Sequence, residues 1–154
     1  MMYSAKTPKV FREITSLNTG DCFTISSRVK KDFDFPLHFH DEYELNLITN
    51  GKGAKRIVGG SIGIIDDIEL VFIGPNIYHA WFMHQCTSTE IKEVTIHFHK
   101  DLFAETFLNR NQACILKNMF NTAQLGVLFS RETTIGLINR ILNLNKKSRF
   151  DAVL

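Results

Sequence analysis

The feature that most constrains the fold is a succession of short β-rich runs, separated by turn signals, between residues 22 and 99. The runs are rich in β-branched and aromatic residues or alternate apolar with polar ones, and they cover 22–29, 43–49, 55–58, 61–65, 69–73, 78–84 and 90–99. Asn50-Gly51 and Gly59-Gly60 supply residues that tolerate the positive φ of tight turns. Short strands at this spacing predict an antiparallel sandwich or barrel.

The pattern changes after residue 100, where apolar residues recur at helical spacing. Ser130 followed by Glu132 predicts a helix N-cap with a favourable charge in the first turn. This helix carries an apolar stripe formed by Ile135, Ile138, Ile141 and Leu142. An amphipathic helix must bury its apolar face, so the stripe either packs on the β domain or forms a dimer seam.

The chain therefore divides into a mostly β domain over 1–100 and a segment of two to three helices over 101–154. Residues 150–154 begin another apolar element at the end of the sequence. We expect the chain to be a fragment of a longer protein.

The length and the net charge of the chain limit the functions that it can have. A chain of 154 residues suits one main hydrophobic core. A net charge of +2 gives little attraction to nucleic acid, and no helix with interleaved Arg and Asn indicates DNA reading by this chain alone.

The cysteines and the ends of the chain bear on its location. The three cysteines lack a CxxC pair, which favours a reduced, cytoplasmic protein. No signal-peptide core or membrane-length apolar run is present, so we expect no membrane association.

One segment carries a pattern of candidate metal ligands. His38 and His40 share a strand face, and Glu44 can join them if the chain turns at Asp41-Glu42. His79, after a Pro-Asn turn signal, is a fourth candidate. Three imidazoles and a carboxylate suit zinc, iron, manganese or nickel. The alternative is a set of polar residues that lines a ligand pocket without a metal.

Other residues near this pattern have two interpretations. Trp81 has the same strand parity as His79, so it either lines the same pocket or packs in the core. For His97 and His99 we expect a polar strand face. The candidate effector pocket is thus formed by His38, His40, Glu44, His79 and Trp81.

The spacing of these residues resembles the first motif of the cupin family, which has the form HxH, three or four residues, E, six residues, G. His38, His40, Glu44 and Gly51 match it without a gap, although Asp32 stands where the motif usually opens with glycine. The second motif, usually PxGxxH, is only approximated by PNIYH at 75–79. The resemblance implies a cupin-like antiparallel β-barrel of the jelly-roll type.

Over nearly its whole length the chain also resembles the N-terminal half of AraC-type transcriptional regulators. The blocks that carry this resemblance are FPLHFHDEYELNLITNGKG, LVFIGPNIYHAW and AQLGVLFSRETTIGLINRIL. It implies a bacterial homodimer whose barrel binds a small effector, often a sugar. DNA binding would belong to a separate C-terminal domain with helix-turn-helix units.

Two other functions stay open at this point. A stand-alone cupin enzyme, a metal-dependent dioxygenase or isomerase, would need a bound ion with an open coordination position. A sugar-binding or structural cupin without a regulatory role is the third alternative.

Overall fold

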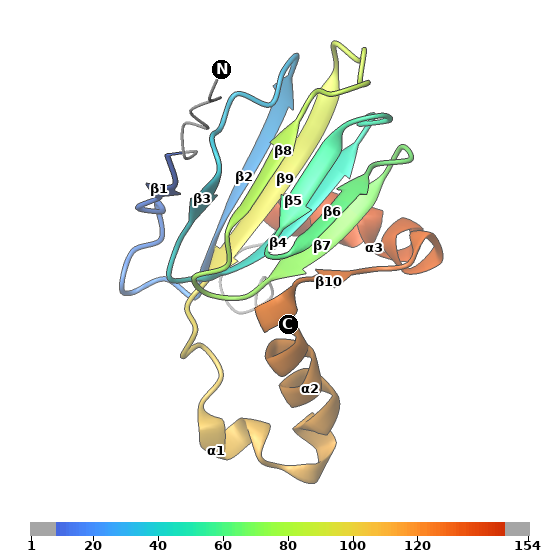
Figure 1. Ribbon diagram of the computed structural model, residues 1–154. Helices are drawn as coiled ribbons and strands as arrows, with labels where there is room; N and C mark the ends of the chain where they lie inside the picture. The colour runs from blue at the N-terminus through green and yellow to red at the C-terminus, as the bar shows by residue number, and fades with distance from the viewer. Residues whose placement is uncertain (1–8, 147–154) are drawn as a thin grey trace.

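The computed structural model describes residues 9–146, which form two five-stranded sheets packed face to face (Figure 1). Sheet I has the order β1 (Phe11–Arg12), β3 (His38–Phe39), β8 (His79–Phe82), β5 (Lys55–Val58) and β6 (Ser61–Ile64). Sheet II has the order β10 (Val127–Leu128), β7 (Glu69–Ile73), β4 (Tyr43–Thr49), β9 (Ile91–Phe98) and β2 (Phe23–Lys30).

The prediction of a mostly β fold with C-terminal helices is confirmed. Neighbouring strands pair antiparallel except β1 with β3. Within residues 9–146 the two sheets do not join into a closed barrel, so the structure is a β-sandwich. Strands β4, β5 and β7 have the bounds that the sequence predicts, because their runs end at clear turn signals.

One hairpin shows how the turn chemistry works. Val58 pairs with Ser61, which leaves Gly59-Gly60 as a two-residue turn between β5 and β6. Gly59 has φ +53°, a backbone conformation that side chains with a Cβ disfavour. The predicted turn at this position is therefore confirmed.

The alternation of sheet II separates two environments. In β4 and β9 the side chains of Leu45, Leu47, Val94 and Ile96 belong to apolar clusters that include helical residues. The intervening residues of the same strands, among them Glu44 and His97, face the interior of the sandwich because a strand points alternate side chains to opposite faces. Sheet II therefore carries helices on one face and the polar site on the other.

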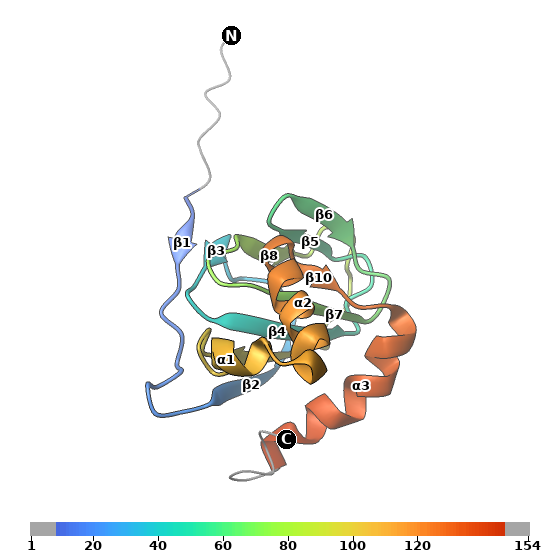
Figure 2. The ribbon, with the colours of Figure 1, turned by 90° about the horizontal axis from the view of Figure 1, so that it is seen from below.

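The first helices after β9 lie at one end of the sandwich, and the last helix lies beside sheet II (Figures 1 and 2). They are α1 (Glu105–Leu108), α2 (Cys114–Thr122) and α3 (Arg131–Asn143), with short 3-10 turns at Asn111–Ala113, Ala123–Leu125 and Leu144–Lys146. Phe120 of α2 and Ile141 of α3 are buried in clusters with side chains of sheet II. Strand β10, between α2 and α3, was not predicted, because two residues are too few to show a periodic pattern.

Helix α3 begins where the sequence predicts. The Ser130 hydroxyl accepts a hydrogen bond from the backbone N–H of Thr133 at 3.2 Å, which confirms Ser130 as the N-cap. Among the described residues no helix is both long and apolar enough to cross a membrane. The apolar element expected at 150–154 lies outside the described residues.

The apolar stripe of α3 is divided between two environments. Ile141 is buried and Ile138 is partly buried against the outer face of sheet II. Ile135 is 54% exposed and Leu142 is 41% exposed. Half of the stripe therefore packs on the β domain, which is one of the two alternatives that the sequence left open. The other half forms an apolar edge on the surface.

Candidate functional site

The two sheets bring the candidate ligands together inside the sandwich. His38 and His79 are paired on β3 and β8 of sheet I. Glu44 and His97 are paired on β4 and β9 of sheet II. His40 follows β3 directly, and the chain then bends at 41–42 and enters the other sheet.

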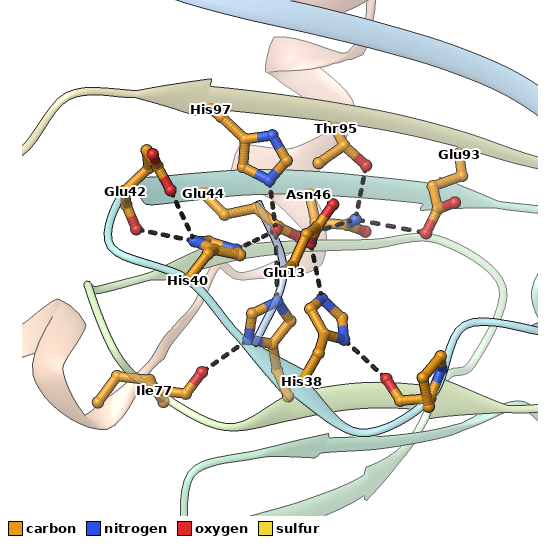
Figure 3. Close-up of polar contacts among 12 residues, drawn as sticks. Glu13, His38, His40, Glu42, Glu44, Asn46, Ile77, Glu93, Thr95 and His97 are labelled. Atoms are coloured by element: carbon orange, nitrogen blue, oxygen red, sulfur yellow. Dashed lines mark hydrogen bonds and ion pairs between the residues drawn. The ribbon is translucent and has the colours of Figure 1, made fainter. Parts of the chain in front are cut away.

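A single carboxylate oxygen lies at the centre of the cluster (Figure 3). Oε2 of Glu44 is 2.9 Å from Nε2 of His40 and 2.9 Å from Nε2 of His97. Nε2 of His79 lies 3.3 Å from the same oxygen. Nε2 of His38 lies 3.4 Å from Oε2 of Glu13, which follows β1. Glu44, His40 and His79 are almost completely buried.

Three of the imidazole rings are oriented by backbone carbonyl groups. The Nδ1 atoms of His38, His40 and His79 lie within hydrogen-bond distance of the carbonyl oxygens of Pro36 (2.8 Å), Glu42 (3.1 Å) and Ile77 (2.7 Å). A carbonyl oxygen only accepts, so each Nδ1 must carry the proton. In the neutral ring the Nε2 lone pair is then free, which is the form in which histidine binds a metal.

This tautomer creates a conflict inside the cluster that a cation would resolve. A neutral Nε2 and a carboxylate oxygen are both acceptors, so their close approach needs either a proton or a positive ion between them. The side-chain donor atoms of His38, His40, Glu44 and His79 all lie within 4.8 Å of one another. Within the described part of the chain, Nε2 of His79 is buried without a hydrogen-bond partner. The four residues predicted as ligands therefore fit a divalent transition metal.

The ionisable groups respond to burial and to each other. Burial alone would raise the pKa of Glu44, but the close approach of His79, His40 and His97 holds it well below its ordinary value. Burial alone would lower the pKa of His40, but Glu44 and the acidic residues nearby raise it. Burial and the neighbouring His79 lower the pKa of His38 to about 4. The pair formed by Glu44 and His40 therefore favours its charged state.

A cavity of about 250 Å³ opens beside the cluster, between the two sheets. His38, Glu44, His97 and Trp81 line it, whereas His40 and His79 do not appear among its lining residues. The rest of its wall combines hydroxyl, charged and aromatic side chains, including those of Thr24, Ser26, Thr95, Arg28, Lys30, Glu93, Phe33 and Phe35. Such a wall suits a small polar molecule with an apolar face.

Asn46 connects Glu44 of the histidine cluster to side chains of the neighbouring strand β9, in the same wall of the cavity (Figure 3). Its Nδ2 donates to Oε1 of Glu44 and to the Thr95 hydroxyl, both at 3.1 Å. The same Nδ2 lies 3.4 Å from Oε1 of Glu93, whose Oε2 accepts from Lys30 Nζ at 2.7 Å. Oδ1 of Asn46 is buried and has no partner among residues 9–146. The acceptor capacity of this covered atom is therefore unused within the described part of the chain.

Trp81 satisfies both interpretations of its position. It is 5% exposed and packs in the apolar cluster between the sheets, and it also lines the cavity. Its indole N–H donates to Oε1 of Glu69 at 3.4 Å, and Glu69 forms a close ion pair with Arg56. Burial raises the pKa of Glu69, and Arg56 offsets that effect only in part.

The structure adds His97 to the residues that the sequence singles out. A polar strand face was expected for His97 and His99, but His97 is only 9% exposed and contacts Glu44. His99 is half-buried, and its Nε2 lies 2.9 Å from the carbonyl oxygen of Asn18. The sequence feature that indicates this position is the alternation of apolar Val94 and Ile96 in β9. Because these two residues face the helices, His97 must lie on the opposite face of the strand.

Comparisons with known proteins support the fold. No family model matches the sequence, and no curated protein sequence matches it. Among solved structures, the chain is similar to ToxT from Vibrio cholerae with bound unsaturated fatty acid, at 20% identity and a TM-score of 0.53 over 91% of this chain and 50% of that one. A second ToxT structure from Vibrio cholerae matches at 14% identity and a TM-score of 0.50, over 79% of this chain and 48% of that one. The chain thus spans about half the length of ToxT and shares the fold of that half.

Proposed function

We propose that this chain is the ligand-sensing and dimerisation domain of an AraC-type bacterial transcriptional regulator. The observation that carries the proposal is the cavity between the sheets, which His38, Glu44 and Trp81 line together with hydroxyl and charged side chains. Two further observations support it: the sequence blocks that resemble AraC-type regulators, and the fold shared with half of ToxT, itself an AraC-family regulator. DNA binding would reside in a separate C-terminal domain, and a cytoplasmic location would go with this function.

The chemistry of the cavity wall guides the choice of effector. Fixed carboxylate, amide and hydroxyl groups pair with hydroxyls of a ligand, and an aromatic face such as that of Trp81 packs on a sugar ring. A sugar is therefore the effector class that we propose first. The unsaturated fatty acid bound to ToxT makes a fatty acid the second candidate, with Arg28 and Lys30 as partners for its carboxylate.

The sheet itself provides a path from the cavity to the helices. Glu44 and His97 face the cavity, while their sequence neighbours Leu45 and Ile96 belong to the cluster that contains Ile138 and Ile141 of α3. An effector that binds more tightly when α3 adopts one of two arrangements would increase the population of that arrangement. The coupling free energy between effector binding and helix arrangement is typically ~1–3 kcal/mol. The spacing of the attached DNA-binding domains would change accordingly.

Dimerisation is assigned to the exposed half of the α3 stripe. Ile135 and Leu142 remain exposed after α3 has packed on sheet II. Two copies of this edge could bury each other, since large exposed apolar side chains favour association. Ile138 and Ile141, which the sequence also places in the seam, pack on sheet II instead, so the proposed dimer seam consists of Ile135 and Leu142.

The cation is a separate part of the proposal. His38, His40, Glu44 and His79 would hold zinc, iron, manganese or nickel, because their donor atoms converge and three rings present Nε2 to the site. When bound, the cation would neutralise Glu44 and order the wall of the cavity. The regulatory role does not depend on it.

Calorimetric titration of the 154-residue chain with monosaccharides and with unsaturated fatty acids tests the effector proposal. We expect one ligand class to bind, and the Asn46→Leu variant to bind at least ~10-fold more weakly, because it breaks the hydrogen bonds that hold Glu44 and Thr95 in the cavity wall. Ser27→Ala, on the exposed side of β2, is the matched control and should bind normally. Binding that Asn46→Leu leaves unchanged would exclude the cavity as the effector site.

A metal-dependent cupin enzyme is the second candidate, and the histidine cluster is the observation that favours it. Such an enzyme would turn over substrate at an ion with an open coordination position. Metal analysis of protein purified without an affinity tag, followed by an oxygen-consumption assay, separates the two functions. Stoichiometric iron with turnover would favour the enzyme, and an inert cation would favour the sensor.

A further inference from the structure

We propose that His97, which lies outside the sequence motif, is an additional ligand of the cation in the histidine cluster. This inference rests on the proposed cation and not on the regulatory role of the domain. Its basis is that Nε2 of His97 is as close to Oε2 of Glu44 as Nε2 of His40 is, at 2.9 Å in both cases.

The distances around Glu44 match the spacing between neighbouring ligands of one ion. Two donors bonded to a metal at about 2.1 Å and separated by about 90–110° lie about 2.9–3.4 Å apart. Nε2 of His40, His97 and His79 lie 2.9, 2.9 and 3.3 Å from the same oxygen of Glu44. Toward Glu44, His97 therefore meets the same distance criterion as His40 and His79, whereas the four donors that all lie within 4.8 Å of one another are those of His38, His40, Glu44 and His79.

A second group of donors leads to the same residue. The donor atoms of Glu13, His40 and His97 lie within 4.8 Å of one another, and His40 belongs to both this group and the motif group. The rings of His40 and His97 have centroids 4.8 Å apart. His97 is thus connected to the site through His40 as well as through Glu44.

The location of His97 gives this ligand a distinct role. His97 lines the cavity together with Glu44 and His38, whereas His40 and His79 do not line it. A cation held by His97 would therefore border the cavity, where a polar atom of the effector could approach it. His97 would form the cavity side of the cation site.

The competing interpretation is that His97 only positions Glu44. In that case a neutral His97 would donate Nε2–H to the carboxylate and would not bind the cation. Glutamine retains an N–H donor but is a poor ligand for zinc, so His97→Gln distinguishes the two roles. His99, half-buried and just beyond the end of β9, offers a matched control on the same segment.

The test is a competition titration of the untagged 154-residue chain with Zn²⁺, carried out on the wild type, His97→Gln and His99→Gln. We expect His97→Gln to weaken Zn²⁺ binding by more than ~100-fold, beyond the ~10–100-fold typical of residues that only support a ligand. His99→Gln should leave the affinity unchanged. With Co²⁺, the visible absorption spectrum of His97→Gln should differ from that of the wild type.

A measurement on the wild type keeps the inference testable if a variant fails to fold. In protein labelled with ¹⁵N-histidine, Zn²⁺ should shift the Nε2 resonance of His97 into the range of metal-bound imidazole and leave that of His99 in place. An unshifted His97 resonance, or a Zn²⁺ affinity of His97→Gln within ~100-fold of wild type, would reduce His97 to a positioning residue. A wild type that binds neither Zn²⁺ nor Co²⁺ would overturn the cation and this inference, while effector binding would still be decided by its own titration.

Discussion

Glu44 and His97 lie opposite each other on the adjacent strands β4 and β9, and a contact of 2.9 Å joins Oε2 of Glu44 to Nε2 of His97. The carboxylate thereby links the motif histidines to a histidine that is 53 residues away in sequence. It is also buried, so it must be balanced by positive charge in its immediate surroundings. Glu44 is therefore the residue on which the integrity of the cluster depends.

Replacing Glu44 by glutamine should destabilise the domain. The substitution keeps the size of the side chain but removes the charge that the histidines surround, at a cost of about 3 kcal/mol for a broken buried pair. Urea unfolding in the presence of a chelator measures the change. Asp41→Asn, at an exposed ion pair with Arg12, is the control and should change the free energy of unfolding by less than ~1 kcal/mol. Equal stabilities of Glu44→Gln and the wild type would contradict the charged state of the cluster.

The stability of the domain should fall as the pH falls from 6.5 to about 4, in part because of His38. Its pKa drops from 6.5 to about 4 on folding, so the unfolded chain binds the proton more tightly and acid favours unfolding. The stabilisation by neutral His38 is fully present above pH 6.5 and is lost as the pH decreases toward 4. The total loss of unfolding free energy is ~3 kcal/mol, because each unit of pKa difference corresponds to ~1.4 kcal/mol. The raised pKa of His40 has the opposite effect on stability at low pH. This effect is present both in the wild type and in the His38→Gln variant that is compared with it.

Unfolding free energies of wild type and His38→Gln, measured with a chelator between pH 4 and 7, check this prediction. We expect the variant to lose less stability than the wild type over that range. Parallel profiles would show that His38 does not contribute to the acid sensitivity.

The exposed half of the α3 stripe should control association. Ile135 is 54% exposed, so Ile135→Asp should change the free energy of unfolding of the monomer by less than ~0.5 kcal/mol. A charge at the proposed seam should nevertheless convert a dimer to a monomer, which light scattering over a range of concentrations detects. A dimer that persists in Ile135→Asp would place the seam elsewhere.

The buried half of the same stripe should control stability. Ile141 is 7% exposed and packs against the core residues of sheet II, so Ile141→Ala should cost ~2–4 kcal/mol by leaving a cavity. Thermal and urea unfolding measure the loss. Leu142→Ala, at the neighbouring exposed position, is the matched control and should have a much smaller effect on the monomer. Equal losses at the two positions would mean that α3 does not pack on the sheet as described.

Much of the site could be predicted from local patterns. The alternation of strand residues placed His38 and His40 on one face, and the polar pair Asp41-Glu42 indicated the bend that brings Glu44 back to them. The N-cap at Ser130 followed from a side chain that bonds its own helix. These features depend on residues close together in sequence, so their chemistry is visible in the chain.

Other features depended on which surfaces meet, and only the tertiary structure decided them. Alternation groups His97 with Glu93 and Thr95 on one face of β9, but a polar face is buried only because sheet I packs over it. The apolar residues of α3 likewise look alike in the sequence, while packing on sheet II covers Ile141 and leaves Ile135 exposed. The sequence by itself determined the strands, the helix start and the spacing of the motif residues, because local geometry sets these. The fifth residue of the cluster and the exposed edge of α3 were decided by packing between elements that are far apart in the chain.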